Sequence, residues 1–184
     1  METDRIALGA LTEGLPPTLF LSPLDRIFAD HFRQRALFRS LDRIATTPDV
    51  DPALITAVTG FLATEVEPHW TDEEDDLFPL LRARAHPEDR IRRLLVRLAR
   101  DHDAARAARA RIIAGLPDPA TRRDPAFRNL LAGFAADERR HLCLENAIVL
   151  PIARARLGHQ DLMVLGQRMA ARRGVPIAMT EYVT

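Results

Sequence analysis

Apolar residues recur every three to four positions along four long stretches of the chain, which is the spacing of one face of an α-helix. Three of the stretches begin with a capping polar residue followed by proline, a pairing typical of the first turn of a helix, and the third stretch along the chain begins with a weaker version, His86-Pro87. The four pairs are Ser22-Pro23, Asp51-Pro52, His86-Pro87 and Asp124-Pro125. The stretches show no competing alternation of the kind that β-strands require, so the pattern predicts helices throughout.

The ends of these helices are marked by turn-forming residues. The markers are Thr46-Thr47-Pro48, Ala85-His86-Pro87, Gly115-Leu116-Pro117 and Gly158. We expect Pro68 to kink the second helix and Pro151 to bend or stop the fourth, because proline removes a helical hydrogen bond. A short fifth helix over about residues 160–173 closes at Gly174.

The short turns favour antiparallel neighbours, so the predicted fold is all-α: an up-down-up-down four-helix bundle with a short C-terminal fifth helix. We divide the chain into an irregular N-terminal lead-in over 1–21, the bundle over 22–157, and a short helix and tail over 158–184. A chain of 184 residues is long enough to bury one core of its own.

The composition sets the expected surroundings of the protein. No run reaches the roughly 18 apolar residues of a transmembrane helix, and the N-terminus lacks a basic signal segment. The single cysteine, Cys143, agrees with a reducing compartment. The 26 basic and 26 acidic residues cancel, so no overall positive field favours nucleic acid. We therefore expect a cytoplasmic protein with neither a membrane nor a nucleic-acid partner, and the sequence identifies no protein partner.

The second and fourth predicted helices each carry a histidine followed four positions later by a glutamate. These pairs are His69 with Glu73 and His141 with Glu145. Residues four apart share one face of a helix, so each pair can offer a metal ion two ligands from one rigid element. Buried, unpaired glutamates are costly, and two of them are hard to keep without a cation or a proton.

Two further histidines, His31 and His102, lie on the apolar faces of the first and third predicted helices. The helical stretches between the candidate ligands and the neighbouring turns differ in length by about four residues at most. This difference corresponds to about 6 Å of helical rise. All the candidates therefore meet at one level of the bundle. Four imidazoles and two carboxylates are enough ligands for two metal ions bridged by the glutamates.

Other polar residues near these positions have less specific expectations. We expect three acids to be solvated, namely Glu74, Asp75 and Asp76. One of them could accept a hydrogen bond from a ligand histidine. Comparable candidates before His141 are Asp137 and Glu138. The residues expected to serve only in packing are Trp70, Phe78 and Cys143, and those expected on the surface are His86 and His159.

Four segments carry a resemblance to the bacterial hemerythrin-like family, whose HHE cation-binding domain is named after its His, His and Glu ligands. They are DHFRQRALF around His31, HWTDEEDDLFPLL from His69, RDHDAAR around His102 and HLCLENAIVLP from His141. The strings that begin at His69 and His141 are specific because each couples the ligand spacing to a following proline. The resemblance covers about residues 22–155.

The resemblance implies a non-haem di-iron centre with Glu73 and Glu145 as bridging ligands, to which an oxo or hydroxo bridge can be added. One iron would bind His31 and His69, and the other would bind His102 and His141. Oxygen-carrying hemerythrins have a further histidine one turn after the third-helix ligand, where this chain has Arg106. That departure argues against a dedicated oxygen carrier.

We expect a protein that binds or senses O₂, nitric oxide, redox state or iron level. The alternative is a stress-defence enzyme that uses the same centre to reduce peroxide or nitric oxide, or to repair damaged iron centres. A third interpretation is an interaction module that holds zinc or manganese, since imidazole and carboxylate ligands also suit these ions.

Overall fold

A computed structural model of the chain describes residues 2–47 and 49–177, and these residues contain helices and no β-strand. The prediction of an all-helical protein is thereby confirmed. Pro48, in the predicted end of the first helix, and residues 178–184 of the predicted tail lie outside the described residues. Within the described part of the chain, no helix is both long and apolar enough to cross a membrane.

Ten α-helices and four short 3₁₀- or π-helices follow one another along these residues. The α-helices are α1 (Glu2–Thr12), α2 (Pro23–Thr46), α3 (Pro52–Thr64), α4 (Val66–Thr71), α5 (Phe78–Arg84), α6 (Arg92–Gly115), α7 (Pro119–Arg123), α8 (Pro125–Leu144), α9 (Leu150–Arg156) and α10 (His159–Arg172). The others are the 3₁₀-helices η1 (Pro17–Leu21) and η3 (Pro87–Asp89) and the π-helices η2 (Asp72–Leu77) and η4 (Glu145–Val149).

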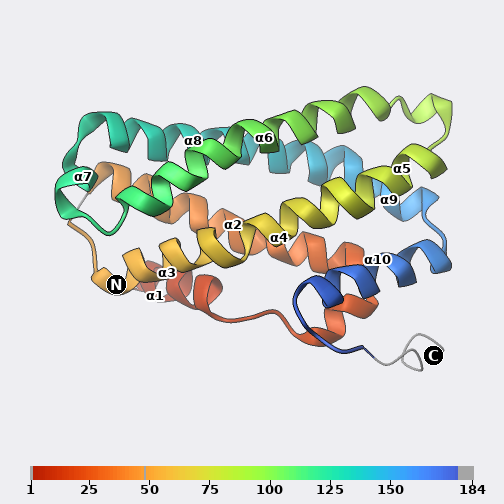
Figure 1. Cartoon of the computed structure of the whole chain (residues 1–184), viewed down its shortest axis with the longest axis horizontal. Coiled ribbons are helices and arrows are strands. Elements are labelled where there is room, and N and C mark those ends of the chain that lie inside the picture. Colours follow the sequence, from red (N-terminus) through yellow and green to blue (C-terminus); the bar gives the residue numbers. More distant parts are fainter. Residues whose placement is uncertain (1, 48, 178–184) are drawn as a thin grey trace.

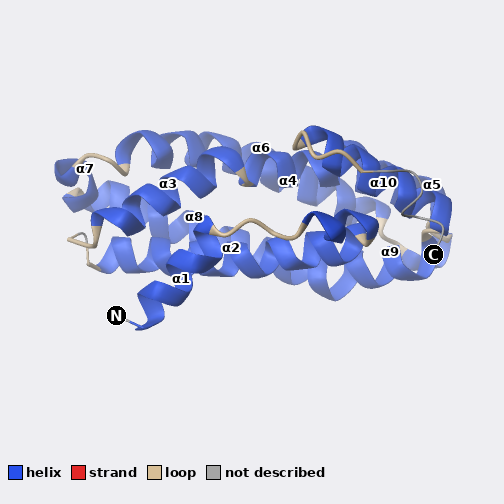
Figure 2. Ribbon diagram, turned by 90° about the horizontal axis from the view of Figure 1, so that it is seen from below, coloured by secondary structure: helices blue, strands red, loops and turns tan. Residues whose placement is uncertain are grey.

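Four long rods built from these helices lie side by side, and each runs opposite to the rod before it (Figure 1). The first rod is α2 and the third is α6. The second consists of α3, α4, η2 and α5 end to end, and the fourth of α8, η4 and α9. Helices α1 and α10 lie on one outer side of the rods (Figure 2), where α1 contacts α2 and α3 while α10 contacts α2 and η2.

The predicted starts of the rods are correct for three of the four. The carboxylates of Asp51 and Asp124 accept hydrogen bonds from the N–H groups of Ala53 and Ala126, at 2.9 and 3.1 Å. Ser22 precedes α2 as expected, although its side chain makes no capping hydrogen bond. The predicted third start at His86-Pro87 forms only the short helix η3, and α6 begins at Arg92.

The third start is displaced because Arg90 adopts a left-handed backbone conformation, with φ of 50°. This conformation ends η3 and redirects the chain before α6, and the sequence gives no sign of it because arginine rarely adopts positive φ. The predicted irregular lead-in is also wrong in part, because Glu2–Thr12 forms α1. Leu8 and Leu11 share one face of α1 and pack on the core, so burial stabilises this helix.

Prolines shape the second and fourth rods without ending them. A break at Glu65 separates α3 from α4 just before Pro68, where a kink was predicted. Both π-helices end two residues before a proline, with Phe78 preceding Pro79 and Leu150 preceding Pro151. Because proline has no N–H, the α-helical bond to the residue four positions earlier cannot form, and the preceding turn widens. Pro151 therefore does not stop the fourth rod, which continues through α9.

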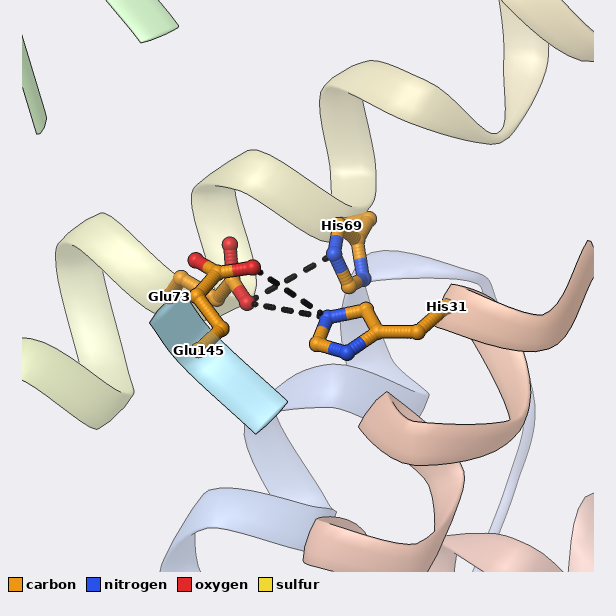
Figure 3. A group of neighbouring side chains, drawn as sticks. All are labelled: His31, His69, Glu73 and Glu145. Atoms are coloured by element: carbon orange, nitrogen blue, oxygen red, sulfur yellow. Dashed lines mark ion pairs between the residues drawn. The ribbon is translucent and has the colours of Figure 1, made fainter. Parts of the chain in front are cut away.

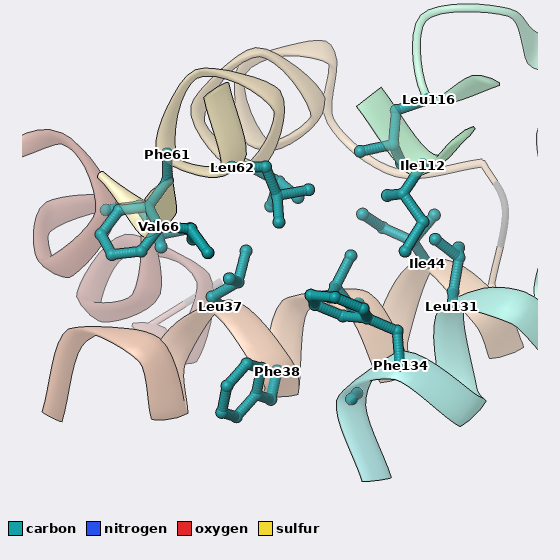
Figure 4. Packing of buried hydrophobic residues seen from close by; sticks show 14 of the residues in the cluster. Leu37, Phe38, Ile44, Phe61, Leu62, Val66, Ile112, Leu116, Leu131 and Phe134 are labelled. Atoms are coloured by element: carbon teal, nitrogen blue, oxygen red, sulfur yellow. The ribbon is translucent and has the colours of Figure 1, made fainter. Parts of the chain in front are cut away.

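The apolar interior consists of two clusters, one toward each end of the rods. One cluster contains Leu37, Phe38, Phe61, Leu62 and Phe134 (Figure 4). The other is built around Ile27, Leu77, Phe78, Leu95 and Leu165. Along each rod the candidate metal ligands fall between members of the two clusters, so a polar layer crosses the middle of the molecule.

Helix α10 is held against the rods by buried ion pairs. Arg172 and Arg173 contact the carboxylate of Asp72, the Arg173 pair at 2.7 Å. Arg172 and Arg168 contact Asp76 at 2.8 and 2.9 Å. Both aspartates are almost completely buried, so the prediction that Asp76 is solvated is wrong. The acid stretch needs the arginines of α10, which lie about 100 residues later in the chain.

Candidate metal centre

The structure brings all six predicted ligand residues together in the polar layer between the two apolar clusters. They are His31 on α2, His69 on α4, Glu73 in η2, His102 on α6, His141 on α8 and Glu145 in η4. None of these residues is more than 4% exposed. Such complete burial of ionisable groups requires a compensating interaction.

The six residues form two groups that share both glutamates. His31 and His69 belong to one group, and His102 and His141 to the other, with one ligand atom per residue lying within 4.8 Å of the others in each group. This division agrees with the pairing that the family resemblance implied. Figure 3 shows the first group, in which the two histidines point toward the carboxylates.

Each glutamate turns one oxygen toward each group. Oε1 of Glu73 lies 3.5 Å from Nε2 of both His31 and His69, whereas its Oε2 lies 3.6 Å from Nε2 of His102. Oε2 of Glu145 lies 3.4 Å from Nε2 of His31, and its Oε1 lies 2.8 Å from Nε2 of His141. A carboxylate with its oxygens divided in this way can bridge two cations.

Several buried atoms of the centre have no hydrogen-bond partner among the described residues. They are Nε2 of His31 and His102, Nδ1 of His69 and His141, and Oε2 of Glu73 and Glu145. Buried polar atoms are nearly always satisfied in proteins, and leaving one without a partner costs about 1–3 kcal/mol. The donor set of neutral imidazoles and carboxylates suits first-row transition metals, so the residues present fit a pair of metal ions.

Burial favours the neutral form of three of the four imidazoles, whereas at His141 it is outweighed by the charge of Glu145, which raises the pKa of that imidazole. Desolvation lowers the pKa of His31, His69 and His102, which leaves their ring nitrogens free to bind a cation. Burial, and then the charge of Glu145, raises the pKa of Glu73. Two bound cations would remove this conflict and hold both carboxylates in the charged form.

Asn146 orients His31 from outside the centre. Its amide nitrogen donates to the carbonyl of Leu142 at 2.8 Å, so its Oδ1 is the acceptor that faces Nδ1 of His31 at 3.0 Å. The Nδ1–H of His31 is therefore used in this contact, and the Nε2 lone pair points to the centre. Asn146 stands directly after Glu145 and is not among the residues that the sequence pattern predicts for the centre.

A chain of charged residues orients His102 in the same way. Nδ1 of His102 donates to Oε1 of Glu74 at 2.8 Å, and Arg106 donates to Oε2 of Glu74, also at 2.8 Å. Although burial opposes the effect, the hydrogen bonds from His102 and Arg106 lower the pKa of Glu74. Glu74 is thus the acid of its stretch that reaches a ligand histidine, one of the outcomes that the sequence analysis allowed.

Arg106, which occupies the position of the missing fifth histidine, points to carboxylates rather than into the centre. Besides Glu74 it contacts Glu67 at 3.0 Å and Asp103 at 2.9 Å. Trp70 stacks on the ring of His102 with centroids 5.2 Å apart, and the ring of Phe78 also stacks on His102, with centroids 6.3 Å apart. These aromatic residues pack as predicted and also fix the plane of a ligand histidine.

The remaining candidates lie outside the centre. His86 and His159 are exposed, as predicted. Cys143 is exposed as well, so the expectation of a packed thiol is wrong; it lies on the outward side of α8. Asp137 is exposed and pairs with Arg140. Glu138 is buried, and burial raises its pKa to about 7.

A family model described as the hemerythrin HHE cation-binding domain matches residues 22–153. This range contains all six residues of the candidate centre and ends within α9. No curated protein matches the chain.

Proposed function

Because the chain belongs to the hemerythrin HHE cation-binding domain family, we propose that it is a non-haem di-iron protein that binds or senses O₂, nitric oxide, redox state or iron level. The observation that supports this proposal most directly is the division of the carboxylate oxygens of Glu73 and Glu145 between the two groups. Mononuclear sites have no need of two carboxylates arranged in this way.

In this proposal His31 and His69 would hold one iron, His102 and His141 would hold the other, and the two glutamates would serve both. When bound, a pair of irons would supply electron transfer and the ability to bind a small ligand. The chain's own contribution is to orient the imidazoles and to exclude bulk water. Asn146 orients His31, and Glu74 with Trp70 orients His102.

The burial of the centre favours a very small ligand. The most exposed of the six residues is His141, at 4%. Diatomic molecules can reach metals behind such walls, whereas larger substrates would need the rods to separate.

We also propose that the four rods form the up-down-up-down bundle expected from the sequence. We further propose that the protein works in the cytoplasm, where an exposed thiol such as Cys143 stays reduced.

Metal analysis of protein purified without chelator, combined with visible spectra before and after reduction, tests this proposal. We expect two irons per chain, near-ultraviolet bands that disappear on reduction, and a spectral change when nitric oxide is added to the reduced protein. Zinc or manganese in place of iron would contradict the proposal. Continuous consumption of peroxide or nitric oxide would instead assign the protein to the stress-defence enzymes.

A further inference from the structure

A cleft of about 500 Å³ lies between α6 and α8 and leads toward one half of the candidate centre. Small residues on both helices, Ala104 and Ala108 on α6 and Gly133 on α8, leave this space open. A Cβ atom added at Gly133 would meet nothing within 4 Å. The rim carries charged residues that are exposed to solvent, so the cleft connects the solvent with the interior.

The inner end of the cleft is formed by His141. Its Nε2 hydrogen-bonds Glu145 inside the centre at 2.8 Å, whereas its Nδ1 lies 3.7 Å from Oδ2 of Asp101, which also lines the cleft. Nδ1 of His141 is buried and has no hydrogen-bond partner in the described part of the chain. One imidazole ring therefore separates the cleft from the centre.

Glu138 lines the same cleft and is only 3% exposed. Within the described ranges its carboxyl group has neither a hydrogen bond nor an ion pair to another residue, and it lines the open cleft. Glu138, His141 and Glu145 stand three and then four residues apart on one continuous helical face. Ligand-type side chains therefore line a path from the cleft into the centre.

The charges of the cleft become less compensated from the rim inward. At the rim, Arg140 pairs with Asp137, and Arg97 lies 3.7 Å from Asp101. No such basic partner accompanies Glu138 among the residues that the structure describes. A cation that enters the cleft therefore passes balanced charges first and then reaches the Glu138 carboxyl group, which has no arginine partner within the described structure and lies beside His141.

We propose that this cleft is the path by which a divalent cation reaches the half of the centre formed by His102 and His141, with the Glu138 carboxylate as its transient ligand. This inference rests on the proposed function, since it concerns the loading of the same centre. On this path the Glu138 carboxylate would replace a water of the hydrated cation, and the ring of His141 would be the last group before the centre. No covalent bond of the protein changes during this passage.

The loading rate of the chelator-treated protein with Fe²⁺ under argon tests the path. Trp70 is the single tryptophan of the chain and stacks on His102, so its fluorescence reports arrival of the metal in this half. We expect Glu138→Gln to slow loading about tenfold, the lower end of what electrostatic steering contributes. Removal of the metal by a coloured ferrous chelator should slow equally, because a group on the path changes both rates and leaves the final metal content unchanged.

A steric variant and a matched control complete the experiment. Gly133→Leu should obstruct the cleft without changing charge and should slow loading and removal together; Gly133→Ala provides a smaller obstruction. Asp137→Asn is the control, because Asp137 is exposed and paired with Arg140, and it should load at the wild-type rate. Wild-type loading rates in Glu138→Gln and both Gly133 variants, with full metal content, would overturn the path. A lower metal content of Glu138→Gln without slower loading would also overturn the path. A wild-type protein that takes up no Fe²⁺ would overturn the proposed function itself.

Discussion

Glu73 and Glu145 differ from the four histidines in how many partners their functional atoms serve. Each carboxylate faces histidines of both groups, whereas each imidazole faces the carboxylates from one side only. Removal of one histidine should therefore affect the binding of one ion, whereas removal of one glutamate should affect the binding of both. This asymmetry is a property of single side chains and can be measured by substitution.

We predict that Glu73→Ala and Glu145→Ala each lose more metal than His31→Ala, when the metal content of the purified variants is compared. His86→Ala and His159→Ala serve as controls and should retain the wild-type content, because both side chains are exposed. If His31→Ala emptied the centre while Glu145→Ala retained both ions, the bridging roles would be wrong.

The side chain of Arg106 bears on how fast the reduced iron protein reacts with O₂. Its guanidinium is held by Glu67 and Glu74, so it supplies no ligand to the half that contains His102. We predict that the reduced iron protein oxidises rapidly in air and that Arg106→His slows this oxidation by supplying an imidazole. The measurement is the decay of the visible spectrum of the reduced protein in air.

Arg106→Gln is the matched comparison, since it removes the same charge without adding an imidazole. It should oxidise at least as fast as the wild type. A wild-type protein that binds O₂ stably, with no change in Arg106→His, would restore an oxygen-carrier role.

At the scale of elements, α10 compensates acids that belong to another rod. Asp72 has no exposed surface, and burial raises its pKa, while Arg173 and Arg172 oppose that rise. Removing the partners of a buried charge costs about 3–5 kcal/mol, whereas exposed pairs contribute about 0–1 kcal/mol. The two kinds of pair occur on the same helix, because Arg168 is largely exposed.

We therefore predict that Arg172→Ala combined with Arg173→Ala lowers the free energy of unfolding by about 3 kcal/mol, measured by urea denaturation. Arg168→Ala should change it by less than about 1 kcal/mol. Equal effects of the two variants would show that the contacts of α10 with Asp72 do not stabilise the fold.

The elements also show what a sequence can predict. Helical periodicity and Asp-Pro starts located the rods, and the spacing of His69 from Glu73 placed both on one face. Three features had no local signal: the left-handed Arg90, the pairing of Asp72 with α10, and the hydrogen bond from His31 to Asn146. Each depends on backbone conformation or on contacts between distant parts of the chain, which periodicity does not encode.

At the scale of the whole molecule, the two apolar clusters do not need the metal, but the polar layer between them does. We predict that the metal-free protein keeps its helical circular dichroism and melts at a lower temperature than the metal-bound form. The reason is that buried imidazoles and carboxylates lack their cations, and binding to the folded state alone stabilises it. Identical melting curves with and without metal would show that binding is not coupled to folding.

The position of the polar layer between the two apolar clusters also affects how cooperatively the protein unfolds. A domain with one continuous core opens as a unit, whereas this protein has an apolar cluster on either side of a section that depends on cations. Metal bound to all four rods would transmit stability from one end to the other. In its absence either end can open locally while the other stays folded, and local opening is what proteases act on. The lifetime of the protein in the cell would then follow its iron supply.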